Sequence, residues 1–407
     1  MVARIFFYSI IVSTFLLLAH SCPHDDSSAV QGPILIDAET LEQNKRLIDQ
    51  NDTILVQAKN LLLESAERAM GGDGYSVTYK DKDQIPAGAT AHDYVSLAPY
   101  MWPDPSKKDG LPFIQRDGRR NPLAATYNDN AMLNGVSQDV LVLGLAYLLT
   151  REEKYADRAA TLLRTFFIDR ETRMNPHFNY SQIVLGKDRS GGNIIAGNAL
   201  LRIVDGIQMI KSSPHWTKRD HGQMIRWFSA LLEWMRTSPK GMVEARRTNN
   251  IGTFYTVQAT TYALFIGDSV LAKDIIEERA YAHIDSQIDQ DGKMPLELKR
   301  ATPWNYVIYN LDAFNMLMRV SRHVGIDLWD YIGDNGGSIR KSYRWVESFL
   351  DRKENSFSFY GQNIDKGSVN KFLQKNPPRD LMKPSDERRG RRSETVNGSN
   401  YIDILTK

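Results

Sequence analysis

Residues 132–149, MLNGVSQDVLVLGLAYLL, and residues 155–167, YADRAATLLRTFF, decide the fold of this chain. The first stretch is strongly apolar over its whole length. The second repeats its apolar residues at the spacing of one helix face, at Ala159, Leu162, Leu163 and Phe166. Two such stretches joined by a short polar turn predict a pair of antiparallel helices.

The same helical spacing recurs along most of the chain from about residue 39 onward. Further helices are expected in residues 47–62, 194–210, 224–235, 254–266, 270–288, 307–324 and 339–350. Period-two runs rich in β-branched residues, which are typical of strands, are scarce. The pattern predicts an all-α protein of successive helix pairs, without the exact repeat of a consensus solenoid.

The composition is that of a globular protein, with 407 residues, 42% hydrophobic and 25% charged. The formal net charge of +2 lacks the strongly basic balance of a nucleic-acid-binding domain, so no nucleic-acid partner is expected. The one basic run, at residues 388–392, is interpreted as part of a solvated tail.

The N-terminus has the pattern of an export signal. Arg4 precedes an apolar stretch over residues 5–19, which is too short to span a bilayer. Cys22, the single cysteine, follows in the sequence LAHSC, which is typical of a bacterial lipoprotein signal; ordinary signal cleavage near Ser21 is the alternative. We therefore expect a signal peptide over residues 1–22, a polar tether over 23–38, and export to the periplasm or outer membrane. The only membrane contact expected is a lipid at Cys22, and no transmembrane helix is expected to follow.

Two irregular stretches rich in aromatic residues, Gly and Pro interrupt the helical pattern, at residues 94–122 and 292–309. Long irregular segments on a helical scaffold are where functional sites tend to lie. In the first, Tyr100 and Trp102 are candidates for stacking on a sugar ring, and Arg116 for binding an anionic group. The alternative is a folded loop that covers the core.

Three further groups of residues carry candidate chemistry. His177 lies among side-chain amides in residues 175–182 and titrates near neutrality, which suits proton transfer, although a lone histidine is usually structural. Asn249 and Asn250 either cap the helix that begins there or bind a substrate carboxylate. Arg300 precedes Tyr306 by six residues, and a nearby guanidinium favours the phenolate and lowers the tyrosine pKa.

These stretches resemble the alginate lyase superfamily of polysaccharide lyases over roughly residues 90–320. The resemblance is carried by YMWPDP (100–105), LPFIQRDG (111–118), MNP (174–176) with Gln182, NNIGT (249–253), and PLELKR (295–300) with Tyr306 and NLDAF (310–314). It implies an (α/α) toroid over residues 39–355 that cleaves an acidic polysaccharide by β-elimination without a metal or other cofactor. Residues 356–407 are expected to form an irregular or helical segment on the same domain, ending in the charged tail.

Residue by residue, the resemblance selects Asn250, Arg300 and Tyr306 as catalytic. His177 is a further catalytic candidate. Candidates for substrate binding are Asn249, Gln182, Tyr100, Trp102, Arg116 and Tyr255. One departure stands out: the family's histidine after the two asparagines is replaced by Ile251, which cannot exchange a proton.

The sequence leaves three functions open. A lyase in which Tyr306 acts as base and acid is expected to prefer polymannuronate or a glucuronan, whose C5 proton and C4 oxygen lie on the same side of the ring. A non-catalytic polysaccharide-binding lipoprotein is consistent with Ile251. A glycoside hydrolase on a similar toroid would need two carboxyl groups, for which Asp93, Asp104, Glu297 and Asp312 are the candidates.

Overall fold

The computed structural model describes residues 32–188, 193–376, 396–398 and 400–406. The expected signal peptide, Cys22 and the basic run at 388–392 lie outside the described residues.

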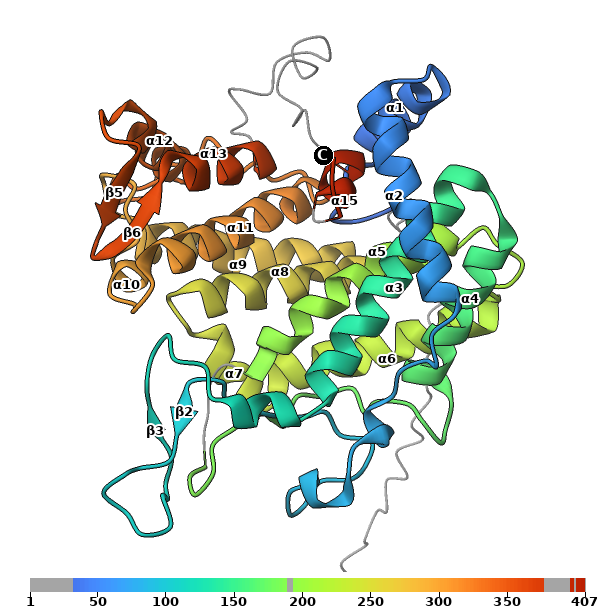
Figure 1. Cartoon of the computed structure of the whole chain (residues 1–407), viewed down its shortest axis with the longest axis horizontal. Coiled ribbons are helices and arrows are strands. Elements are labelled where there is room, and N and C mark those ends of the chain that lie inside the picture. The colour runs from blue at the N-terminus through green and yellow to red at the C-terminus, as the bar shows by residue number, and fades with distance from the viewer. Residues whose placement is uncertain (1–31, 189–192, 377–395, 399, 407) are drawn as a thin grey trace, which may run out of the picture.

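The all-α prediction is confirmed (Figure 1). Every stretch predicted as helical contains a helix, and the short helices α7, α10, α13 and α15 add to them. The helices are α1 (Ala38–Asp49), α2 (Thr53–Met70), α3 (Asp129–Thr150), α4 (Glu153–Leu163), α5 (Leu200–Ile210), α6 (Lys218–Thr237), α7 (Pro239–Ala245), α8 (Asn250–Phe265), α9 (Ser269–Gln287), α10 (Pro295–Leu298), α11 (Pro303–Arg322), α12 (Ile339–Glu347), α13 (Lys366–Lys375) and α15 (Tyr401–Thr406).

Four helices, α3, α5, α8 and α11, form an inner layer, and we call them the inner helices. Helix α3 packs on α5, α5 on α8 and α8 on α11. Helices α3, α5 and α8 are buried around most of their circumference, whereas α4, α6 and α9 each bury one face against them, as an outer layer does. The apolar residues of both layers form one continuous core.

Helices α3 and α5 approach closely because glycines face their contact. A Cβ on Gly206 would lie 2.6 Å from the Val140 side chain, and one on Gly144 would lie 3.2 Å from the Gly206 carbonyl and 3.3 Å from Met209. Residue numbers rise together along this contact, so the two helices run in the same direction. Helices α3 and α5 therefore begin at the same end of the inner layer.

Helix α3 is long and apolar enough to cross a membrane by length and composition alone, with a mean hydropathy of 1.4, but 61% of that window is buried inside the protein. Its apolar surface contacts α2, α4 and α5. These contacts show that α3 is a core helix, and its burial accounts for its high hydropathy.

Three two-stranded sheets accompany the helices. Strand β1 (Val95–Leu97) pairs in parallel with β4 (Tyr180–Ile183), and β2 (Met101–Trp102) pairs with β3 (Ile114–Gln115) in the antiparallel sense. Strands β5 (Ser356–Phe359) and β6 (Gln362–Asp365) form a hairpin. The β1–β4 pair holds two of the candidate segments, 94–122 and 175–182, side by side.

The chain ends of the described region pack on the same core. The backbone N–H groups of Ile34, Leu35 and Ile36 all donate to the buried carboxylate of Asp205 in α5. Helix α15 packs on α1 and α2. Residues 34–38 therefore belong to the folded domain, which corrects the tether boundary expected at residue 38.

Candidate active site

The guanidinium of Arg300 lies at the centre of a cluster that joins two irregular segments. It donates to both carboxylate oxygens of Asp117, at 3.0 and 2.6 Å, and its Nη2 also donates to the Tyr306 hydroxyl at 2.6 Å. The backbone N–H of Ala301 adds a third hydrogen bond to Asp117. Arg300 follows α10 and Tyr306 lies in the first turns of α11, whereas Asp117 comes from the loop after β3. The cluster therefore unites segments about 180 residues apart in the sequence.

Burial has a larger effect on the pKa of the Tyr306 hydroxyl than the neighbouring charge of Arg300 does. Its pKa lies above the ordinary value because burial and a hydrogen bond with Tyr100 outweigh the opposing charge of Arg300. Arg300 does act to lower this pKa, as expected from the sequence, but the net shift in the free protein is upward. The predicted lowering of the Tyr306 pKa is therefore wrong. The hydrogen bond with Arg300 holds the pKa of Asp117 below its ordinary range, so Asp117 is ionised and balances much of the guanidinium charge.

Asn250 begins α8 and binds a buried carboxylate. Its side-chain amide donates to both oxygens of Glu297, at 2.8 and 2.9 Å, and its backbone N–H donates at 2.8 Å. Asn250 is 3% exposed, and burial raises the pKa of Glu297. Asn249 caps the helix by accepting from the Ile251 N–H at 3.2 Å, which is the first of the two roles considered for these asparagines. The carboxylate that Asn250 binds here belongs to the protein itself.

A row of hydrogen-bonded polar side chains begins next to Tyr306 and connects α11 with α8. Tyr309, one turn along α11, accepts a hydrogen bond from Asn198 at 2.9 Å, and Asn198 in turn accepts from Gln258 of α8 at 2.6 Å. The pKa of Tyr309 is raised to about 12, chiefly by burial. Neither Tyr309 nor Asn198 was predicted as a site residue from the sequence. The i+3 spacing of Tyr309 from Tyr306 was the available signal.

His177 lies in a separate cluster. Its Nε2 is 3.1 Å from Asp93, which also accepts from Asn175 at 2.7 Å, and its Nδ1 accepts from the Asn179 N–H at 3.4 Å. Burial lowers the pKa of His177, against the effect of Asp93. Both ring nitrogens therefore have protein partners, which does not favour a role in moving protons.

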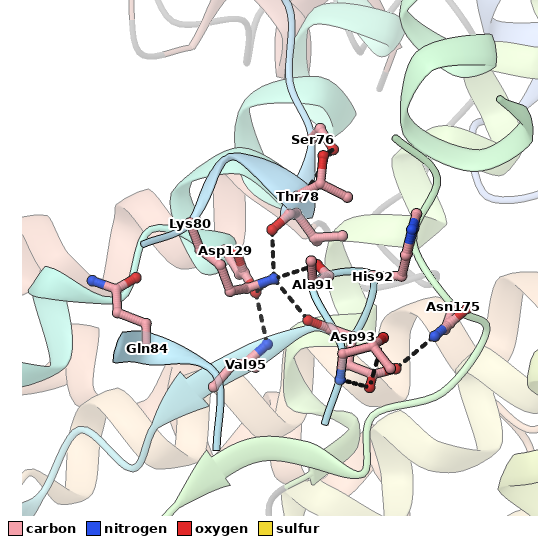
Figure 2. A network of polar contacts seen from close by, with 12 residues as sticks. Ser76, Thr78, Lys80, Gln84, Ala91, His92, Asp93, Val95, Asp129 and Asn175 are labelled. Carbon is pink, nitrogen blue, oxygen red and sulfur yellow. Dashed lines mark hydrogen bonds and ion pairs between the residues drawn. The ribbon is translucent and has the colours of Figure 1, made fainter. Parts of the chain in front are cut away.

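Figure 2 shows how the Asp93 segment is held. Lys80 donates to the carbonyls of Val77, Ala91 and Asp93, and it forms a buried ion pair with Asp129 at 3.0 Å. Asp129, at the start of α3, also accepts from the Val95 N–H at 2.8 Å. The ion pair thus ties the segment before β1 to an inner helix. Neither residue had been singled out, because a lysine and an aspartate 49 positions apart carry no local signal.

The remaining candidates differ in their surroundings. Tyr100, Trp102, Arg116 and Gln182 are partly exposed, and the Arg116 guanidinium lies 5.6 Å from the centre of the Trp102 ring. Gln182 adopts a left-handed backbone conformation (φ 52°), and its N–H donates to Ser96. Tyr255 is the exception: it is 2% exposed, and its hydroxyl donates to the Met235 carbonyl. This burial corrects its assignment as a substrate-binding residue.

The four carboxylates considered for hydrolysis all have protein partners. Glu297 binds Asn250, Asp93 binds Asn175, Asp104 binds Ser106, and Asp312 binds Asn376. Across the described ranges, no group of three or more His, Cys, Asp or Glu side chains is placed to hold a metal ion.

Comparisons with known proteins agree with this arrangement. The alginate lyase family model matches residues 76–357. An alginate lyase from Bacteroides ovatus, known from its crystal structure, is 30% identical, with a TM-score of 0.81 over 93% of this chain and 100% of that one. A variant of alginate lyase A1-III complexed with a tetrasaccharide shares the fold at 14% identity, with a TM-score of 0.52 over 80% of each chain.

A search of curated proteins finds no match. The matching solved structures have the (α/α) toroid fold, as predicted from the resemblance. On the evidence of the family model and of the Bacteroides ovatus structure, this chain belongs to the alginate lyase family and is a polysaccharide lyase.

Proposed function

We propose that the chain cleaves alginate or a related polyuronate by β-elimination, with Tyr306 as both base and acid. The observation that carries the proposal is the 2.6 Å hydrogen bond from Arg300 to the Tyr306 hydroxyl, in a chain of this family. A donor held at this oxygen stabilises the phenolate whenever the proton leaves.

In the proposed step, the Tyr306 phenolate takes the C5 proton of a uronate. A double bond forms between C4 and C5, and the bond from C4 to the glycosidic oxygen breaks. The phenol then gives its proton to that oxygen, which regenerates the phenolate. Because the pKa of Tyr306 is raised in the free protein, kcat/KM is expected to rise with pH through the alkaline range, as the base form becomes more populated.

The weakly acidic C5 proton leaves only if the carboxylate charge is neutralised as an enolate-like state develops. Arg300 is the nearest cation to Tyr306, and its hydrogen bonds to Asp117 fix the plane of the guanidinium. Asn250 is the other candidate. Its amide reaches a substrate only if its bonds to Glu297 are exchanged or supplemented, so the geometry favours Arg300 for direct contact.

The alternative of a polysaccharide-binding protein without activity rests on Ile251. This residue is partly buried in the first turn of α8 and packs against the core, in the place of the family's histidine. A lyase that uses tyrosine for both proton transfers does not need that histidine. Because the histidine is not needed in this mechanism, we favour the catalytic function.

The same reasoning proposes a substrate preference. One tyrosine serves both transfers only where the C5 proton and the C4 oxygen share a face, as in mannuronate and glucuronate. Guluronate is inverted at C5 and would need a second group on the other face. The expected partner is therefore an acidic polysaccharide rich in mannuronate or glucuronate, met outside the cytoplasm after export, with Cys22 as the proposed lipid anchor.

The deciding experiment incubates the purified mature protein with polymannuronate, glucuronan and polyguluronate while absorbance near 235 nm is followed. Unsaturated product from the first or second polymer supports the proposal. Efficient cleavage of pure polyguluronate would refute the single-tyrosine mechanism. Binding without product from any polymer would instead support the non-catalytic function.

A further inference from the structure

Gln287, at the end of α9, joins the two helices that carry Asn250 and Tyr306. Its side-chain oxygen accepts hydrogen bonds from Thr253 of α8 at 3.1 Å and from Asn310 of α11 at 2.8 Å. Thr253 follows Asn250 by three residues, and Asn310 follows Tyr306 by four. A single oxygen atom therefore connects α8 with α11 within about one helical turn of each candidate residue.

Asn310 extends this connection to the segment that carries Glu297. Its amide nitrogen also donates to the sulfur of Met294 at 3.5 Å. Met294 is 1% exposed and immediately precedes α10, the short helix that contains Glu297, the partner of Asn250. Side chains of α8, α9, α11 and the start of α10 thus meet in one hydrogen-bonded network, which we call the Gln287 network.

His283 fixes the direction in which the Gln287 amide points. The Gln287 Nε2 donates to His283 Nδ1 at 3.1 Å, because an amide nitrogen is a donor and not an acceptor. Burial lowers the pKa of His283 to about 4, so the ring is neutral at pH 7 and carries its proton on Nε2. This nitrogen donates to Thr256 at 2.8 Å, and Thr256 donates to the Gly252 carbonyl. With its nitrogen held by His283, the amide presents its oxygen to α8 and α11.

The Gln287 network is buried where apolar side chains are usual. Four of its side chains are at most 3% exposed: Thr253, Thr256, Gln287 and Asn310. Gly252 leaves room for the His283 ring in the first turn of α8, because a Cβ there would lie 3.0 Å from the ring carbon Cε1. Apolar cores can repack, whereas buried hydrogen bonds specify one arrangement of the groups that they join. The network therefore fixes how α8 and α11 lie relative to each other.

We propose that Gln287 is a positioning residue for the β-elimination, which sets the place of Tyr306 relative to Asn250. The proposal deepens the proposed function and rests on it for the roles of these two residues. Because Gln287 is buried, it acts through the helices and not by contact with the polymer. A misplacement of about 1 Å caused far from the reacting atoms can lower a rate by about 10²-fold, so its loss should affect the chemical step.

The kinetic test compares Gln287→Met and Gln287→Glu with the wild type on polymannuronate. Gln287→Met removes the accepting oxygen and should lower kcat by about tenfold or more, while KM changes by less than about threefold. Gln287→Glu keeps an oxygen for Thr253 and Asn310, and its other oxygen faces His283, whose Nδ1 can carry a proton. Its kcat should therefore stay within about threefold of the wild-type value.

Thr253→Val is a milder variant, which removes one donor to Gln287 and should also lower kcat more than it changes KM. Thr261→Val is its matched control. Thr261 is equally buried, two turns along α8, and its hydroxyl donates to the Val257 carbonyl of the same helix. Its kcat should equal that of the wild type. If Gln287→Met does not fold, the Thr253→Val and Thr261→Val pair decides the question.

Crystal structures of the wild type, Gln287→Met and Thr253→Val separate this proposal from the proposed function. If the wild type forms no product from any uronate polymer, the lyase mechanism fails, while a displacement of the Tyr306 hydroxyl relative to Asn250 by about 0.5 Å or more in the variants still supports the positioning role. An unchanged place of Tyr306 in both variants would overturn the proposal. Wild-type kcat in folded Gln287→Met, or equal losses of kcat in Thr253→Val and Thr261→Val, would also overturn it.

Discussion

Two acidic residues, Asp205 in the inner helix α5 and Asp117 in the loop after β3, accept hydrogen bonds from different kinds of donor. Asp205 is 2% exposed and accepts three backbone N–H bonds, from Ile34, Leu35 and Ile36 at 2.7–3.1 Å. Asp117 is partly exposed and takes two of its bonds from the Arg300 side chain. Backbone donors are fixed by the main chain, whereas a side-chain donor can turn toward a ligand.

The difference separates a structural end of the molecule from a reactive one. At the Asp205 end, the hydrogen-bonding groups serve to close the domain with the N-terminal segment. At the Asp117 end, Arg300 also donates to the hydroxyl of Tyr306, and Asp117, Arg300 and Tyr306 are all partly exposed. Changes at the first end should alter stability, and changes at the second should alter turnover.

The largest effect is expected for Tyr306→Phe. Removal of the hydroxyl should lower kcat by about 10²–10⁴-fold, the range for loss of a general acid–base group, while the melting temperature changes little. Steady-state kinetics on polymannuronate and a thermal melt measure the two. Tyr309→Phe, one turn along the same helix, is the control and should lower kcat less than tenfold. Near-normal turnover in folded Tyr306→Phe would exclude the assignment.

Arg300→Ala comes next. The loss of the carboxylate-neutralising cation should lower kcat/KM by about 2.7–4 kcal/mol, comparable to removal of an oxyanion donor. Asn250→Ala should also lower kcat/KM. It should reduce the free energy of unfolding as well, because the buried Glu297 loses two donors. If both variants keep the wild-type kcat/KM, the substrate carboxylate is held elsewhere, and Arg116 is the next residue to replace.

At the other end, the expected effect is on stability alone. Burial raises the pKa of Asp205 from 3.8 to about 6, so the folded protein binds this proton more tightly than the unfolded chain does. The contribution of Asp205 to the free energy of unfolding should therefore fall by up to about 3 kcal/mol as the pH rises from about 4 to about 6, and stay constant above. The contributions of other titrating groups to the pH dependence cancel when the wild type is compared with Asp205→Asn.

Urea unfolding of the two proteins at several pH values between 4 and 7 checks this sign. Their difference in unfolding free energy should change in favour of Asp205→Asn as the pH rises, while kcat/KM at 25 °C stays equal for both. A difference that is constant with pH would show that the three backbone donors balance the effect of burial on this carboxylate, and a change in favour of the wild type as the pH rises would show that they outweigh it.

Much of the fold and part of the candidate site could be predicted from the sequence. The remaining features could not be predicted, for physical reasons. Apolar spacing located the helices, because burial of one face leaves a period of 3.6 residues. The Arg300–Tyr306 pair was visible because both residues lie in one short segment. The pairing of Arg300 with Asp117 and of Asn250 with Glu297 could not be predicted, since these hydrogen bonds join residues 183 and 47 positions apart in the chain. The sign of the Tyr306 pKa shift depends on burial, which spacing does not reveal.

The smallest effect is expected at His177, which belongs to neither end. Ile251 cannot supply an imidazole, and His177 was the candidate to replace it. In the structure, its Nε2 faces Asp93 and its Nδ1 accepts from the Asn179 N–H, so neither nitrogen is left for a substrate proton. Because burial lowers its pKa, the ring is neutral at pH 7 and adds no positive charge for a uronate. His177→Ala should therefore keep kcat within tenfold of the wild type and leave the alkaline rise of kcat/KM in place. Its cost should appear in the thermal melt, since Asp93 loses a partner that helps to hold the segment before β1. A folded His177→Ala protein without activity would contradict this, and would assign to the imidazole the proton transfer that we give to Tyr306.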